Sequence, residues 1–156
     1  MNRVRGSTAV TVRRASLADV PALYLVVHEA YLLYVPRIGR MPAPMAADYS
    51  AAVRSGQAWV ALADGEIAGL IVLVVYQGYL LIENIAVLPS AQRRGIGARL
   101  LALAEDEARA NGLGEIRLYT NEGMTENLAY YPRRGYVETH RAEEEGFRRV
   151  FFSKQL

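Results

Sequence analysis

A predicted strand, a turn with two glycines and a long amphipathic helix follow one another in the middle of this 156-residue chain. Residues 79–88 form an apolar run that predicts a buried strand. Apolar residues then recur every three or four positions across residues 96–108, as on one face of a helix, and Asn111-Gly112 is a typical helix end. Residues 115–120 predict the next strand. Because helical crossovers join parallel strands in a right-handed sense, we expect this strand to run parallel to the first.

The turn between the first strand and the helix reads Gln92-Arg93-Arg94-Gly95-Ile96-Gly97-Ala98. Glycines at a helix start let the backbone approach a ligand closely, and the free N–H groups there favour a phosphate or pyrophosphate. A tight turn before a helix would explain the same glycines. A P-loop requires Gly-Lys-Ser/Thr where this chain has Gly97-Ala98-Arg99, and a dinucleotide fold requires a third glycine where Leu100 stands. The pattern therefore indicates a loop that binds a pyrophosphate without breaking it.

The rest of the chain predicts a single α/β domain over residues 1–156 with a mixed sheet, in which residues 1–7 form a loose tail. Further strands are expected at residues 8–13, 58–63, 66–76, 135–140 and 147–153, and further helices at residues 19–27, 45–55 and 125–131. Ser16 to Asp19 resembles a capping box for the first helix. Residues 31–44 contain three prolines and Gly39, so we expect an irregular segment there.

The composition is that of a globular protein, with 52% hydrophobic residues and a net charge of +2. The absence of cysteine excludes a disulfide framework and a thiol nucleophile, and His28 and His140 form no metal-ligand pattern, so no metal is expected. No apolar run approaches the ~20 residues needed to span a bilayer, and we recognise no signal peptide. We therefore expect a cytoplasmic protein without a membrane partner. Nothing resembles a recognition helix or a single-strand platform, so no nucleic-acid partner is expected.

The residues of the glycine turn resemble a known motif. Gln92-x-x-Gly95-x-Gly97 is similar to the acyl-CoA-binding signature Q/R-x-x-G-x-G/A of the GNAT superfamily of N-acetyltransferases. Asn127-Leu128-Ala129-Tyr130-Tyr131, followed by Gly135-Tyr136, resembles the second motif of that family. The order of elements matches from about residue 10 to residue 152. The resemblance implies a mixed, mostly antiparallel sheet of about seven strands flanked by about four helices.

The resemblance also implies an acetyl-CoA-dependent N-acetyltransferase, in which a primary amine attacks the thioester directly, without a covalent acyl-enzyme. Acetyl-CoA would lie where the fourth and fifth strands separate, its pantetheine paired with the fourth strand and its pyrophosphate on the glycine turn. The residues implied to bind it are Ile85, Ala86, Val87, Gln92, Arg93, Arg94, Gly95, Ile96, Gly97, Ala98, Asn127 and Tyr130. The asparagine of the family commonly stands where this chain has Met124. Asn127 stands four residues before Tyr131, and residues four apart lie on the same face of a helix. We therefore choose Asn127 over Asn121 for this role.

Two residues are candidates for catalysis. Glu83 interrupts an apolar strand, where desolvation would raise the pKa of its carboxyl towards the range of a base. It could equally be a structural carboxylate, or the amine could arrive neutral. Tyr131 stands four residues before Gly135, like the catalytic tyrosine of the family, and could protonate the departing thiolate. The alternative is a core tyrosine, with Tyr130 as competitor for the role. A backbone N–H near residue 85 or 86 would stabilise the oxyanion.

The acceptor is expected to bind at the irregular segment. Tyr31 and Tyr34 could form an aromatic wall, and Arg37 and Arg40 could bind a carboxylate or phosphate. Glu29 or Asp48 could bind an amine, and an ordinary packed loop is the alternative. A small-molecule amine is favoured over a protein N-terminus or lysine. A non-catalytic acyl-CoA-binding module stays open, and a homodimer is possible.

Overall fold

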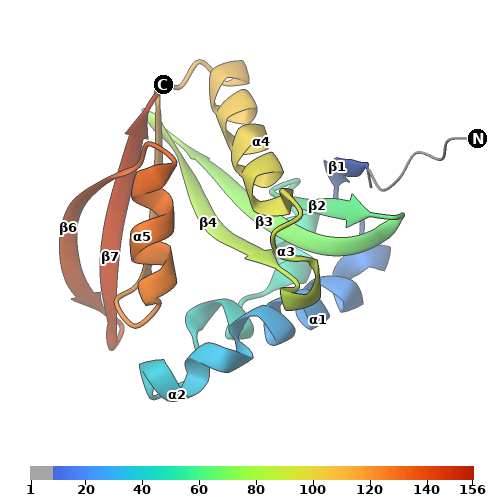
Figure 1. The fold of residues 1–156 in the computed structure, drawn as a ribbon. Coiled ribbons are helices and arrows are strands. Elements are labelled where there is room, and N and C mark those ends of the chain that lie inside the picture. Colours follow the sequence, from blue (N-terminus) through green and yellow to red (C-terminus); the bar gives the residue numbers. More distant parts are fainter. Residues whose placement is uncertain (1–8) are drawn as a thin grey trace, which may run out of the picture.

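The computed structural model describes residues 9–156 and contains a seven-stranded sheet with the order β1-β2-β3-β4-β5-β7-β6 (Figure 1). The strands are β1 Val10–Arg14, β2 Ala58–Ala63, β3 Glu66–Tyr76, β4 Tyr79–Val87, β5 Glu115–Asn121, β6 Val137–Glu144 and β7 Phe147–Gln155. All neighbouring strands are antiparallel except β4 and β5, which are parallel as expected. This confirms the expected fold class. The expected loose tail, residues 1–7, lies outside the described residues.

Helices connect the strands. They are α1 Val20–Tyr31, α2 Val35–Ile38, α3 Tyr49–Arg54, α4 Ile96–Ala110 and α5 Thr125–Arg133, with short 3₁₀ turns at Leu17–Asp19, Leu32–Tyr34, Ala43–Ala46 and Pro89–Ala91. Ser16 and Asp19 form the expected capping box at the start of the first turn. The carboxylate of Asp19 also binds the Arg13 guanidinium through contacts of 2.7 and 3.1 Å, which fixes β1 to the helix start.

Two expectations about the segment after α1 are wrong. Residues 31–44 are largely helical rather than irregular, because Pro36 and Pro44 each stand in the first turn of a short helix, where a missing N–H costs nothing. Gly39 then ends α2 with a φ of +83°. The helix expected at residues 45–55 begins only at Tyr49, after Asp48 accepts a hydrogen bond of 3.0 Å from the Ala51 N–H.

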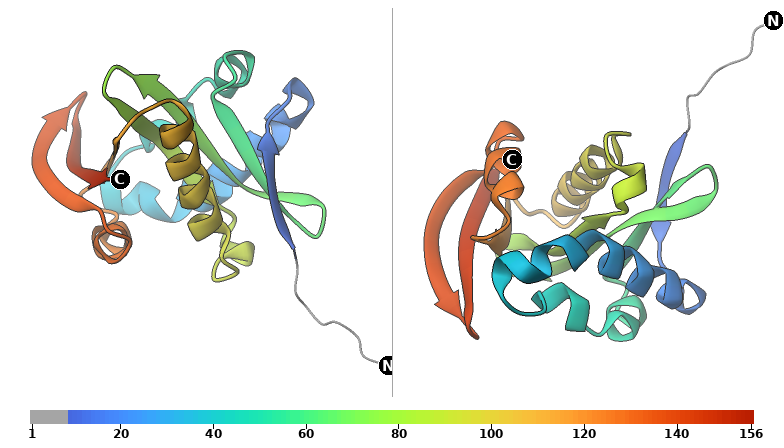
Figure 2. Two further views of the ribbon diagram at one scale, coloured as in Figure 1. Left: turned by 90° about the horizontal axis from the view of Figure 1, so that it is seen from above. Right: turned by 60° about the horizontal axis from the view of Figure 1, so that its bottom comes forward.

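The helices cover both faces of the sheet. On one face α4 buries Ile96 and Leu100 against the strands. On the other face α1 and α3 bury Leu23, Val27 and Tyr49 in a second cluster. Figure 2 shows α4 on one side of the sheet and α1 along the opposite side. The sheet is therefore the middle of three layers, and residues of β4 reach the clusters on both sides.

The continuous stretch Leu17–Ile38 corrects one expectation about membranes. It is 22 residues long with a mean hydropathy of 1.2, so that by length and composition it could cross a bilayer. In the structure it is divided into α1, α2 and two 3₁₀ turns, and α1 buries Leu23, Val26 and Val27 in the core. Core helices of soluble proteins meet the same length and hydropathy criteria.

An inserted residue in β4 decides which way the side chains of this strand point. Val72 of β3 pairs with Asn84, but the next residue, Leu73, pairs with Ile82, so that Glu83 has no partner opposite it. This is a β-bulge. Ile82 therefore belongs to the cluster under α4, whereas Asn84 contacts side chains of the α1 and α3 layer. Without the bulge, residues 82 and 84 would face the same side.

Candidate active site

The separation of β4 from β5 opens a cleft in the sheet. The two strands pair only from Leu80 to Ile82 with Ile116 to Leu118, although both continue beyond that point. In Figure 1, β4 and β7 approach each other near the C-terminus and lie apart at the other end. The cleft is lined by Tyr31, Ile38, Pro42, Ala43, Pro44, Ala47, Asp48, Tyr49, Ala52, Val72, Ile82, Glu83, Asn84, Ile85, Leu118, Tyr119, Thr120, Asn121, Met124, Asn127, Tyr131, Phe147 and Arg149.

Glu83 lies at the point where the strands separate, and its carboxyl lines the cleft. The expectation that this side chain is buried is wrong, because the bulge turns it out of the apolar pattern and leaves the residue exposed. Glu83 remains a candidate base because it lines the cleft and is accessible to water.

Asn84, next to Glu83, forms a buried polar network that the sequence analysis missed. Its amide oxygen accepts a hydrogen bond of 2.7 Å from the Tyr31 hydroxyl, and its amide nitrogen donates one of 2.8 Å to the Tyr49 hydroxyl. Tyr49 donates in turn to the Pro44 carbonyl at 2.7 Å. Burial raises the pKa of both tyrosines above the ordinary value, so their phenols stay neutral donors. A polar residue in an apolar strand was the available signal, but we read it only for Glu83.

Tyr131 on α5 places its side chain between the cleft and the core. Its ring packs edge-on against Tyr130 and Tyr136, with centroids 5.3 and 5.7 Å apart, and lies 5.8 Å from the Phe152 ring. The residue is buried but lines the cleft. Burial raises the pKa of its phenol, so the hydroxyl carries a proton over the whole physiological range. A held proton beside the cleft is what a general acid needs.

The asparagine candidates both reach the cleft. The Asn127 amide nitrogen donates to the Thr120 hydroxyl at 3.0 Å, which fixes the amide against β5. The Asn121 side-chain oxygen accepts from the Gly123 N–H at 2.8 Å and so serves the turn before α5. Met124, where the family places its asparagine, is buried and its sulfur lies 3.6 Å from the Thr120 hydroxyl.

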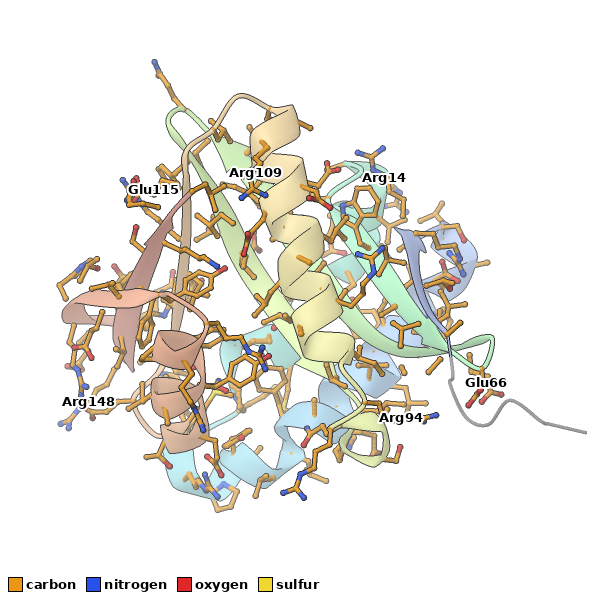
Figure 3. The ribbon with its side chains drawn as sticks, turned by 45° about the horizontal axis from the view of Figure 1, so that its top comes forward. Arg14, Glu66, Arg94, Arg109, Glu115 and Arg148 are labelled. Atoms are coloured by element: carbon orange, nitrogen blue, oxygen red, sulfur yellow. The ribbon has the colours of Figure 1, made fainter. Side chains whose placement is uncertain are left out.

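The glycine turn precedes α4 in the conformation expected of an anion site. Arg93 and Gly95 both have positive φ, of +68° and +80°. The first helical hydrogen bond runs from Arg99 to the Gly95 carbonyl, so the N–H groups of the intervening residues, 96 to 98, have no partner within the helix. The Arg94 side chain beside the turn forms an ion pair of 3.2 Å with Asp64 (Figure 3).

The other cofactor candidates flank this turn. A Cβ on Gly97 would lie 3.1 Å from the Tyr130 hydroxyl, so only glycine leaves the space between α4 and α5 open. Arg134 stacks on the Tyr130 ring at 4.7 Å. Gln92 is exposed on the turn. The backbone of residues 85–87 pairs with β3 on one edge only, and the Ile85 carbonyl accepts a hydrogen bond of 3.3 Å from Tyr31.

The residues expected to bind the acceptor divide into two groups. Tyr31 lines the cleft and belongs to the Asn84 network. Tyr34, Arg37 and Arg40 do not line it. The Arg37 guanidinium stacks on Tyr34 and forms an ion pair of 2.6 Å with Glu126 of α5. The Arg40 guanidinium stacks on the Phe147 ring at 4.1 Å and donates to the Glu145 carbonyl at 3.1 Å. Asp48 lines the cleft as the cap of α3, whereas Glu29 is exposed on α1 outside it.

Tyr119, Phe147 and Arg149 also line the cleft, and the sequence analysis did not propose them. The Arg149 guanidinium lies 4.4 Å above the Tyr119 ring and 5.7 Å from the Phe147 ring. These residues come from β5 and β7, which the chain brings together only in the sheet. No local pattern marked them. Arg148 and Arg149 are neighbours in the sequence, but only the Arg148 side chain is exposed on the surface.

A family model described as the acetyltransferase (GNAT) family matches residues 24–136, which include the glycine turn, α5 and all the cleft-lining residues except Phe147 and Arg149. The chain belongs to the GNAT family. This GNAT chain is 36% identical over 88 residues to aminoalkylphosphonate N-acetyltransferase of Salmonella typhimurium, with 52% of this chain and 56% of the relative covered. It is 36% identical over 70 residues to IAA acetyltransferase of Azospirillum brasilense, with 45% and 46% covered. The chain thus spans about half the length of the curated relatives it matches.

Solved structures of other GNAT proteins share the fold along nearly the whole chain. PaiA N-acetyltransferase of Thermoplasma acidophilum, in complex with coenzyme A, superposes with a TM-score of 0.74 at 18% identity, covering 95% of this chain and 99% of that one. Ard1 of Thermoplasma volcanium gives a TM-score of 0.76 at 18% identity, with 95% and 98% covered. At these identities the likeness shows the fold of this GNAT chain.

Proposed function

We propose that this GNAT chain transfers an acetyl group from acetyl-CoA to the primary amine of a small molecule. The observation that carries the proposal is that an accessible carboxyl, Glu83, and a buried phenol, Tyr131, line one cleft where the sheet opens. A base for the amine and an acid for the leaving thiolate are the two proton functions that the reaction requires. The relatives named as acetyltransferases of aminoalkylphosphonate and IAA support the reaction type.

The residues along the cleft fit acetyl-CoA as co-substrate. The unpaired N–H groups at the start of α4 would bind its pyrophosphate, and Gly97 leaves room between α4 and the Tyr130 hydroxyl. The edge of β4 that β5 leaves unpaired would bind the pantetheine through the backbone of residues 85–87. The Asn127 amide, held by Thr120, would orient it from α5.

Each proton step has a residue in position. An ammonium has no lone pair, so the acceptor must lose a proton before it attacks, and the solvent-exposed Glu83 carboxyl would accept that proton through water. Tyr131 would give its phenolic proton to the sulfur of the departing thiolate. Burial keeps this proton on the phenol while the amine attacks, so that it is present when the thiolate departs.

Contacts at the hairpin end of the cleft favour a small acceptor over a protein. Arg37 binds Glu126 of α5 at 2.6 Å, and Arg40 binds the Glu145 carbonyl in the turn between β6 and β7 at 3.1 Å. These contacts join the segment after α1 to the opposite wall of the cleft. A peptide chain would need that end open, so a protein N-terminus or lysine is the second candidate acceptor.

The proposal extends to location and partners. We propose action on soluble substrates in the cytoplasm, because the apolar segment Leu17–Ile38 uses α1 in the protein core. Neither a nucleic acid nor a membrane is among the proposed partners, and a homodimer is possible.

Calorimetric titration with acetyl-CoA, followed by free-thiol release with a panel of amines and peptides, tests the proposal. We expect saturable binding and turnover with at least one small amine. Glu83→Gln should lower kcat most at low pH, where the ammonium dominates, with little change in acetyl-CoA affinity. Binding without turnover of any acceptor would make the chain a non-catalytic acyl-CoA-binding module. Faster turnover of peptides than of small amines would favour the protein-directed alternative.

A further inference from the structure

Arg149 is a largely covered cation that lines the cleft. Its side chain is only 11% exposed, although it lies on the hairpin strand β7, where its neighbour Arg148 is 77% exposed. The guanidinium is sandwiched against the Tyr119 ring at 4.4 Å and near the Phe147 ring at 5.7 Å, and it lines the cleft. Aromatic faces hold such a group in place but accept none of its hydrogen bonds.

The hydrogen bonds of Arg149 are largely unused. A guanidinium has five N–H donors and stays charged at physiological pH. Within the described part of the chain, Nη1 donates to the Glu144 carboxylate at 2.8 Å, and the Arg149 side chain forms no other hydrogen bond. Glu144 is 48% exposed, so water weakens this single pair. A buried cation with spare donors facing a cleft is suited to bind an anionic group.

Arg149 and Glu83 approach the same aromatic ring from different strands. Tyr119 follows Leu118, the last residue of β5 paired with β4, and Glu83 follows Ile82, its partner. Both charges act on the Tyr119 phenol: after burial, which raises its pKa, Arg149 lowers and Glu83 raises it. The cleft therefore has a positive group, Arg149, and a negative group, Glu83, among its lining residues.

We propose that the acceptor is a short zwitterion, whose carboxylate or phosphonate binds Arg149 while its amino group lies towards Glu83. This deepens the proposed function and rests on it. The charge arrangement disfavours diamines, because a second ammonium would lie against the guanidinium. Arg149 acts here as a specificity residue that positions the amine. The aminoalkylphosphonate of one relative's name combines the same two groups.

Steady-state thiol release with four matched acceptors tests the inference: β-alanine, aminomethylphosphonate, propylamine and diaminopropane. We expect the native protein to prefer an anionic acceptor, and the phosphonate and carboxylate arms tell which anion fits. In Arg149→Gln, the ratio of kcat/KM for the anionic acceptor over propylamine should fall about tenfold or more. Arg148→Gln, on the outer edge of the hairpin (Figure 3), is the matched control and should leave the ratio unchanged.

A second variant keeps the test independent of the stability of Arg149→Gln. Glu144→Gln removes the negative charge that, among residues 9–156, alone pairs with the Arg149 side chain, so KM for the anionic acceptor should fall severalfold while KM for propylamine stays constant. Preference for propylamine or diaminopropane over both anions, or equal losses for all acceptors in Arg149→Gln, would overturn the inference.

The proposed function can fail separately. If no amine leads to thiol release, the proposed acetyl transfer is wrong. Calorimetric titration with β-alanine then tests the acceptor inference by itself. Binding that Arg149→Gln abolishes and Arg148→Gln retains would support it. No binding to the native protein would refute it.

Discussion

The side-chain amide of Asn84 donates a hydrogen bond of 2.8 Å to the hydroxyl of Tyr49, and both residues are buried at the floor of the cleft. The two lie 35 residues apart in the chain. The bond exists because the bulge at Glu83 turns Asn84 towards α3 instead of α4. One inserted residue thus both opens the side chain of Glu83 to water and fixes the helical layer under the cleft.

Tyr49→Phe is expected to lower the free energy of unfolding by about 1–3 kcal/mol, because it leaves the Asn84 N–H and the Pro44 carbonyl without their shared partner. Chemical denaturation monitored by circular dichroism measures the loss. Tyr76→Phe, whose residue is 44% exposed at a strand end, is the matched control and should change stability little. Equal stabilities of the two variants would show that the network contributes nothing.

Tyr131→Phe is expected to lower kcat about a hundredfold, because the variant lacks the hydroxyl that we propose to protonate the thiolate. The hydroxyl makes no hydrogen bond within the described residues, so stability and acetyl-CoA affinity should stay near those of the native protein. Stopped-time thiol-release assays and calorimetry separate the two effects. An unchanged kcat would exclude Tyr131 as the acid and turn attention to Tyr130.

Tyr136→Phe should stabilise the protein by about 1 kcal/mol, because the Tyr136 hydroxyl is buried without a hydrogen-bond partner among residues 9–156 and its removal relieves a desolvation cost. The ring contact with Tyr131, at 5.7 Å, would persist in the variant. Thermal unfolding measures the difference. A lower melting temperature would mean that water or a ligand satisfies this hydroxyl in solution.

Gly97→Val is expected to weaken acetyl-CoA binding at least about tenfold, since a side chain there meets the Tyr130 hydroxyl and fills the approach to the free N–H groups of α4. Gly114→Val, where a Cβ would meet no atom within 4 Å, is the control. Calorimetry with acetyl-CoA gives both affinities. Native-like binding by Gly97→Val would reduce the glycine turn to an ordinary helix start.

Asp19 links stability to acid pH. Its hydrogen bonds to Arg13 lower the pKa of this carboxyl from 3.8 to about 2. The folded state therefore holds the ionised form more strongly than the unfolded chain does, and the stabilisation, about 2 kcal/mol, is present above about pH 4 and lost as the pH falls towards 2. Asp19→Asn should be less stable at neutral pH and lose less between these values. The control is Asp106→Asn, on the exposed face of α4. Its free energy of unfolding, measured by chemical denaturation, should change with pH as that of the native protein does.

The parallel unit from β4 through α4 to β5 was predictable from the sequence, and so were the hairpins and the Ser16–Asp19 capping box. Each depends on a period of two or 3.6 residues or on a turn between neighbours in the chain. The glycine turn and Tyr131 could likewise be recognised from the sequence, because each belongs to a short motif of neighbouring residues.

Local patterns failed where contacts between distant segments decide the conformation. Residues 32–46 fold into short helices that are held by Arg37 on Glu126 and Arg40 on Phe147, contacts that no local period encodes. The prolines there were read as breakers, but Pro36 and Pro44 each stand in the first turn of a short helix.

The sequence by itself determined the family, the glycine turn that precedes α4 and the acid candidate Tyr131. Only the tertiary structure decided the environment of Glu83, the network around Asn84 and the place of Arg149 on the Tyr119 ring. The bulge depends on pairing between β3 and β4, and Arg149 meets Tyr119 only because β5 and β7 are neighbours in the sheet. Charge and burial at a site follow from which strands are adjacent, and adjacency is a property of the whole fold.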